Sequence, residues 1–192
     1  MITNIYLIIC AAIFIYINFI NKDDKLLCAL KLGAFYPPNV RDNKEYYRFF
    51  MCNFIHIDFF HFLLNGYALY DLGRFFEAIL GPVPYLLLII ISMFLSAMLC
   101  YSASQVSTRY DNTITLGASG VVYGFFGAIV ALGILAQGTY GALLQNFMYI
   151  ILINVLYTFM NKQISKTGHL GGFIGGVLAI VILMAMQVVP LL

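Results

Sequence analysis

Residues 168–176 read GHLGGFIGG, and residues 117–128 read GASGVVYGFFGA. In each stretch small residues recur at every fourth position: Gly168, Gly172 and Gly176 in the first, and Gly120, Gly124 and Ala128 in the second. This spacing lets two helices approach closely in a membrane. We therefore expect the two stripes to face each other, which would bring Ser119 and His169 to the same end of the helix pair.

The composition is that of a membrane protein. Of the 192 residues, 62% are hydrophobic and 9% are charged, against roughly half and about a quarter in soluble domains. A water-soluble globule is therefore excluded. The net charge of +2 predicts no nucleic-acid partner. Four cysteines are too few for a secreted disulfide scaffold, although Cys28 and Cys52 could in principle form a bridge.

Six stretches are apolar enough to span a bilayer as helices, which takes about 20 residues each. They are Ile2–Ile20, Phe59–Leu80, Val83–Ala103, Ser119–Ala136, Ala142–Met160 and His169–Val189. The first lacks the basic start and the cleavage site of a signal peptide, so we expect it to be retained. Residues 137–139 predict a tight connection between the fourth and fifth spans.

These features predict an all-α, polytopic membrane protein with six transmembrane helices in a single domain, residues 1–192. The first loop, about residues 21–57, mixes most of the charge of the chain with many apolar side chains. Such a segment is expected to lie on the membrane surface rather than in water.

Polar groups at membrane depth are costly and mark candidate functional sites. Gly117 and Gly120 flank Ser119 and permit a tight turn that exposes its hydroxyl. A neutral histidine such as His169 can take the serine proton and later protonate a leaving amine. Because no acidic residue stands out as a third member, the sequence predicts a Ser-His dyad.

A serine nucleophile also needs donors for the oxyanion that forms during attack. His61 and Asn65 are four residues apart, so they lie on one face of the second span. Together with the backbone N–H of Ser119 they could form such a hole. Alone, however, a membrane serine more often bonds its own helix, and His169 could simply cap a helix.

Other chemistries fit the sequence less well. His56 and His61 fall on different helix faces and no H-E-x-x-H motif occurs, so we expect no metal and no cofactor. Aspartyl chemistry needs two converging carboxylates, whereas Asp71 and Glu77 lie on one helix beside Arg74. A small transporter lined by Ser119, Asn65 and His169 stays open as an alternative, although no inverted repeat supports it.

Five short motifs occur in a fixed order between about residues 47 and 176. They are Tyr47-Arg48; His56, His61 and Asn65 as H-x(4)-H-x(3)-N; Gly73, Glu77 and Gly81 as G-x-x-x-E-x-x-x-G; Gly117-Ala118-Ser119-Gly120 as G-x-S-G; and His169, Gly172 and Gly176 as H-x-x-G-x-x-x-G. In this order they resemble the rhomboid family of intramembrane serine proteases.

The resemblance implies that Ser119 is the nucleophile, that His169 is the general base and acid, and that His61, Asn65 and the Ser119 N–H form the oxyanion hole. Tyr123 matches a family tyrosine that packs on the catalytic histidine. The remaining matches imply supporting or structural roles for His56, Gly117, Gly120, Arg48, Glu77, Gly172 and Gly176.

The substrates implied are single-span membrane proteins, cleaved where their helix unwinds near the bilayer surface. The implied location is the plasma or an inner membrane, with the active site opening to the non-cytosolic side. The lysine-rich first loop disagrees with that orientation under the positive-inside rule, which long loops can escape. Tyr47 also replaces the usual tryptophan. The second hypothesis is a catalytically inactive relative that binds membrane-protein clients.

Overall fold

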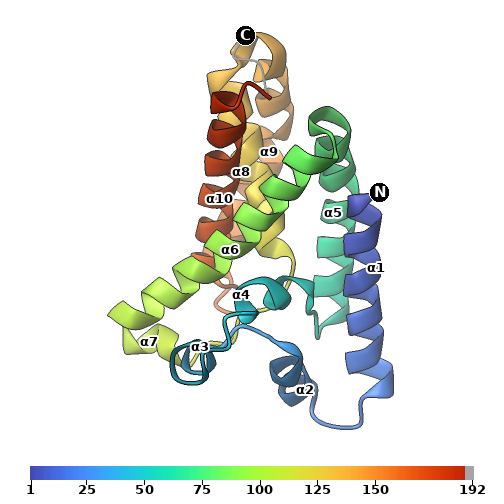
Figure 1. Ribbon diagram of the computed structural model, residues 1–192, viewed down its shortest axis with the longest axis vertical. Coiled ribbons are helices and arrows are strands. Elements are labelled where there is room, and N and C mark those ends of the chain that lie inside the picture. The colour runs from blue at the N-terminus through green and yellow to red at the C-terminus, as the bar shows by residue number, and fades with distance from the viewer. Residues whose placement is uncertain (189–192) are drawn as a thin grey trace.

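The computed structural model describes residues 1–188, and its regular elements are helices (Figure 1). The long helices are α1 (Ile2–Ile15, continued by the π-helical turn η1, Tyr16–Ile20), α5 (Phe59–Leu80), α6 (Pro82–Val106), α8 (Ser119–Leu135), α9 (Gln137–Met160) and α10 (Lys166–Ala185). The short helices are α2 (Lys25–Leu32), α3 (Pro37–Asn43), α4 (Arg48–Met51), the 3-10 turn η2 (Cys52–Phe54) and α7 (Thr108–Asp111). The predicted all-α class is confirmed.

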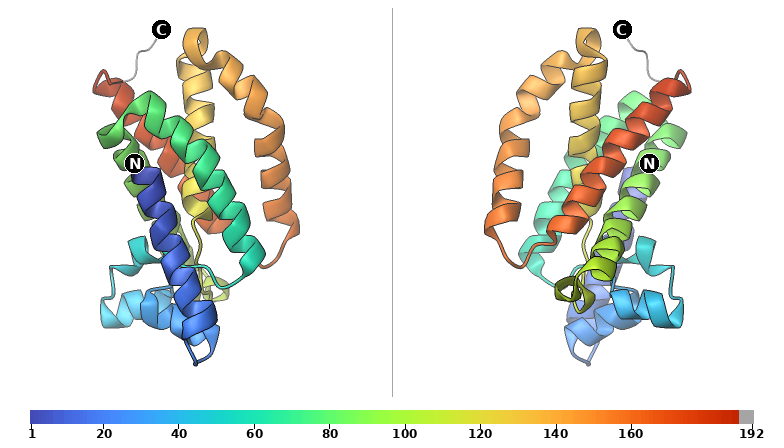
Figure 2. Two further views of the ribbon diagram at one scale, coloured as in Figure 1. Left: turned by 90° about the vertical axis from the view of Figure 1, so that its right-hand side faces the viewer. Right: turned by 90° about the vertical axis from the view of Figure 1, so that its left-hand side faces the viewer.

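Helix α8 lies at the centre of the bundle. Its residues 120–129 are all buried, as expected for a helix that is apolar on every side. Helices α6 and α10 pack on it, and α10 runs beside it in Figure 1. Helix α9 stands to one side of this core, as Figure 2 shows in orange, and most of its side chains are exposed.

The small residues of α8 and α10 face each other, as their spacing predicts. A Cβ atom added to Gly172 would overlap the carbonyl oxygen of Gly120, and one added to Gly176 would overlap that of Gly124. The other glycine stripe of α10, which includes Gly171, lies against α6. Backbone-to-backbone contact of this kind fixes the register of α8 and α10 tightly.

Four helices in the described range are long and apolar enough to cross a membrane: Ile2–Ile20, α6, α9 and α10. The other two predicted spans are also helices. However, α5 carries Asp71, Arg74 and Glu77, and α8 has only 17 residues.

Three boundaries differ from the sequence prediction. Residues 137–139 are the first turn of α9, not a loop. Helix α10 begins at Lys166, because the Ser165 hydroxyl caps it by accepting from the Gly168 N–H. Helix α6 extends over Pro82–Val106, a few residues beyond the predicted span. The predicted last residue, Val189, lies outside the described residues.

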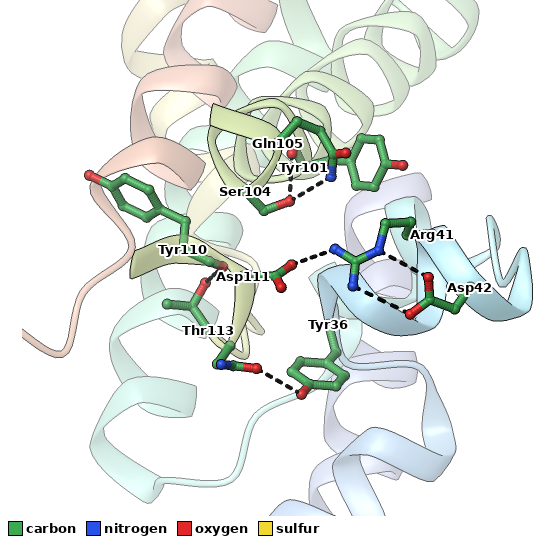
Figure 3. Close-up of polar contacts among 10 residues, drawn as sticks. Tyr36, Arg41, Asp42, Tyr101, Ser104, Gln105, Tyr110, Asp111 and Thr113 are labelled. Carbon is green, nitrogen blue, oxygen red and sulfur yellow. Dashed lines mark hydrogen bonds and ion pairs between the residues drawn. The ribbon is translucent and has the colours of Figure 1, made fainter. Parts of the chain in front are cut away.

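The first loop is folded into short helices that gather at one end of the bundle (Figure 1). Phe35 and Thr115 form an isolated antiparallel bridge with two backbone hydrogen bonds of 2.9 Å. In Figure 3, Arg41 donates to Asp42 and reaches Asp111 of α7 at 2.7 Å. The backbone bridge and the ion pair therefore connect the first loop to the segment that leads into α8.

The possible bridge between Cys28 and Cys52 is not formed, and both cysteines are free and buried. They lie in separate apolar clusters, with Cys28 packed near Ile17 and Cys52 near Phe35. Each therefore acts as a small apolar core residue.

Candidate active site

The candidate site contains a serine and a histidine in direct contact. Ser119 is the first residue of α8, and His169 lies in the first turn of α10. The Ser119 Oγ lies 2.8 Å from the His169 Nε2, which is the length of a good hydrogen bond. His169 is buried, with 8% of its surface exposed. The glycine contacts between α8 and α10 produce this proximity, because they hold the starts of the two helices together.

The turn before Ser119 is held in an unusual backbone conformation. Gly117 has φ of +111°, a region that disfavours residues with a Cβ atom, and a Cβ there would collide with the His61 ring. The Gly117 N–H donates to the Cys52 carbonyl at 2.9 Å. As the first helical N–H, that of Ser119 needs no carbonyl of its own helix and remains available to a ligand.

His56 supports this turn from the first loop. Its Nε2 accepts a hydrogen bond from the Ala118 N–H at 3.1 Å. Burial, with a smaller contribution from nearby His61, lowers the pKa of His56 to about 3. The ring is therefore neutral at physiological pH and can act as an acceptor. Because it occupies the Ala118 N–H, that group is not free to bind an oxyanion, which fits a structural role for His56.

His61 and Asn65 lie on α5, on the side that faces Ser119. Both line a cavity of about 490 Å³ together with Ser119 and His169. The Asn65 Nδ2 donates to the His61 carbonyl at 2.9 Å, which orients the amide and leaves its second N–H unused. The cavity walls come from α5, α6, α8, α9 and α10, from parts of the first loop and from the turn before α8.

The His169 ring is held on two further sides. Tyr123, one turn after Ser119, stacks on it with ring centroids 3.9 Å apart and an angle of 20° between the planes. The His169 Nδ1 lies 2.9 Å from the Oγ1 of Thr158 on α9. Our sequence analysis did not single out Thr158. The signal that could have found it is that Asn154 and Thr158 are polar and four residues apart in the half of α9 that is otherwise mainly apolar.

Arg48 and Glu77 lie away from the cavity, where they join separate parts of the fold. Buried Arg48 pairs with Glu45 and donates to the carbonyls of Leu30 and Ala34 at 2.8 and 2.6 Å. Neighbouring Tyr47 is exposed beside its guanidinium.

Glu77 connects the end of α5 to the start of α1. Its carboxylate accepts from the backbone N–H groups of Ile2 and Thr3 at 2.7 and 3.1 Å, and from the Thr3 hydroxyl at 2.8 Å. A carboxylate at a helix N-terminus is favourable because it satisfies unpaired N–H groups and opposes the helix dipole.

Within residues 1–188, no three His, Cys, Asp or Glu side chains gather in a way that could hold a metal ion.

Comparison with known proteins agrees with this arrangement. The family model described as "Rhomboid domain" matches residues 43–186. The chain is 31% identical over 137 residues to "Rhomboid protease GluP" of Bacillus subtilis (strain 168), covering 70% of this chain and 25% of that protein. It is also 31% identical over 152 residues to "RHOMBOID-like protein 1" of Arabidopsis thaliana, covering 77% and 37%. The chain thus spans only about a quarter to two fifths of the length of these relatives. On this match, the chain belongs to the rhomboid family and is an integral membrane protein.

Proposed function

We propose that this protein is an intramembrane serine endopeptidase that cleaves transmembrane segments of single-span membrane proteins through a Ser119-His169 dyad. The observation that carries the proposal is the 2.8 Å contact between the Ser119 Oγ and the His169 Nε2, at the wall of a cavity within apolar helices. A serine hydroxyl becomes a useful nucleophile when an adjacent base can take its proton.

In the proposed mechanism, Ser119 Oγ attacks the scissile carbonyl while its proton moves to the His169 Nε2. The oxyanion is stabilised by the Ser119 N–H and by side-chain donors from His61 and Asn65. Losing one such donor typically costs about 3 kcal/mol of transition-state stabilisation. His169 then gives its proton to the leaving amine. A water molecule next attacks the acyl-enzyme while one of its protons moves to His169, which returns that proton to the Ser119 Oγ as the bond to the acyl group breaks.

The substrate must reach Ser119 with its backbone exposed. A transmembrane helix hides its carbonyls in hydrogen bonds, so a cleavable segment has to unwind, and irregular backbone is tolerated at membrane depth only beside protein or water. The cavity has apolar and polar walls, because α5 and α9 contribute apolar side chains as well as polar groups such as Asn65 and Asn154.

We also propose that α5 and α8 cross the bilayer with the four longer apolar helices, giving six spans in one unit. The shortness of α8 is compatible with this because α8 is buried among the other helices. The charged residues of α5 lie in the half of that helix that ends at Leu80, and charged side chains near a helix end can reach the membrane interface. The folded first loop would then lie at the membrane surface, on the non-cytosolic side to which the site opens.

The test is cleavage of single-span reporters by the purified protein in liposomes. Ser119→Ala and His169→Ala are compared with Ser102→Ala, a matched control on α6. We expect cleavage by the wild type and the control and none by the two dyad variants. Unchanged cleavage by Ser119→Ala would refute the mechanism. Binding of several reporters without cleavage by any form would favour the inactive client-binding alternative.

A further inference from the structure

The second ring nitrogen of His169 has a partner that the dyad does not require. His169 Nδ1 lies 2.9 Å from the Thr158 Oγ1, and Thr158 is 4% exposed. Within α9, Ile151 and Thr158 are the buried residues, and the other side chains are at least partly exposed. The helix thus buries one hydroxyl, and it does so against the base.

The surrounding contacts favour one direction for the Thr158–His169 hydrogen bond. Thr158 Oγ1 donates to the Asn154 carbonyl, which can only accept, at 2.9 Å. The Tyr123 hydroxyl contacts both the Asn154 carbonyl and the Thr158 Oγ1, and it can donate to either. While it donates to Asn154, Thr158 meets His169 as an acceptor. The contact between Thr158 and His169 is then a hydrogen bond when the His169 proton sits on Nδ1.

We propose that Thr158 is a positioning residue that holds His169 in the Nδ1–H tautomer, with Nε2 free to accept from Ser119. This inference rests on the proposed function, since it concerns the base of the same dyad. Thr158 exchanges no proton in the reaction. The Nδ1 proton stays where it is while the serine proton moves to Nε2 and then to the leaving amine. The same hydroxyl therefore accepts from the neutral ring and from the imidazolium.

Thr158→Val tests this role because it removes the hydroxyl and keeps the shape. The Tyr123 hydroxyl can still donate to the Asn154 carbonyl, so the stacking of Tyr123 on His169 is preserved. The Nδ1–H of the productive tautomer would lose its acceptor, and the ring would shift toward the Nε2–H form, which cannot accept from Ser119. We expect kcat to fall about 10- to 100-fold, as for a buried donor left without a partner, with little change in KM.

Two further variants separate positioning from simple destabilisation. Thr158→Ser keeps the hydroxyl and should restore most of kcat. Thr113→Val makes the same chemical change at a threonine that also bonds a preceding carbonyl, that of Tyr110 at 2.8 Å, and should leave kcat unchanged. An unaffected kcat in Thr158→Val, or an equal loss in Thr158→Val and Thr158→Ser, would overturn the proposal.

The tautomer itself can be measured without substrate. Nitrogen-15 NMR of histidine-labelled protein in detergent micelles distinguishes protonated from unprotonated ring nitrogens, and His169→Ala identifies the His169 signals. We expect the proton on Nδ1 in the wild type and a mixture in Thr158→Val. A wild-type proton on Nε2 would overturn the inference. Failure of the wild type to cleave any reporter would instead refute the proposed function, which this measurement does not depend on.

Discussion

The contact between α8 and α10 allows a quantitative prediction about Gly172. A Cβ atom at this position would lie 2.0 Å from the Gly120 carbonyl oxygen, where ordinary contact begins at 3.4 Å. In Gly172→Ala the helices must therefore separate by about 1.4 Å, since both partners are backbone. Ser119 is adjacent to Gly120, and His169 lies one turn before Gly172. Their 2.8 Å hydrogen bond would lengthen to about 4 Å, beyond the limit for such a bond.

A misplacement of about 1 Å in an active site can cost about 100-fold in rate. We thus expect Gly172→Ala to reduce kcat/KM for a single-span reporter by about 100-fold or more, and the overpacking to lower stability by about 1–3 kcal/mol. Gly141→Ala on α9 is the matched control, because a Cβ there meets nothing within 4 Å. Full activity in Gly172→Ala, measured in liposomes beside this control, would refute the reasoning.

Three further predictions concern the first loop. Arg48→Gln breaks a buried ion pair and should lower the free energy of unfolding by about 3 kcal/mol in a denaturant titration. Hydrogen bonds from Asn39 and then Arg48 lower the pKa of Glu45 below its ordinary value of 4.5. The stability that this ionised carboxylate contributes should therefore be lost as the pH falls below 4.5. Glu45→Gln should make the unfolding midpoint depend less on pH in this range. Asp111→Asn removes a partly exposed ion pair with Arg41, so it should change stability by less than about 1 kcal/mol and leave reporter cleavage within twofold.

Much of the fold follows from patterns visible in the sequence. Apolar stretches of sufficient length predict the long helices, and the bounds Ile2–Ile20 and Phe59–Leu80 agree with the structure. The glycine spacing predicts which faces of α8 and α10 meet, and hence that Ser119 and His169 are neighbours. The second prediction succeeds because small residues on a helix face permit close contact between the backbones of two helices.

The role of α9 could not be predicted in this way. Its side chains are apolar around most of the helix, so no face is distinguished, and Thr158 gains its partner only from the way α9 packs beside α8 and α10. The start of α9 was also missed, because Gly138 and Thr139 are typical of turns but equally acceptable in a first helical turn. The first omission arises where tertiary packing determines the outcome, and the second where one local pattern fits two structures.

The docking of the first loop shows how a polar segment can control a site inside the membrane. Thr115 is bonded to Phe35 through two backbone hydrogen bonds, the Gly117 N–H to Cys52, and the Ala118 N–H to His56. These bonds hold three of the four residues just before Ser119, so the turn has little freedom to relax. Backbone bonds beside buried Phe35 are screened by salt far less than the partly exposed Arg41–Asp111 pair. The position of Ser119 should therefore depend on the fold of the loop and hardly on the charges at its surface.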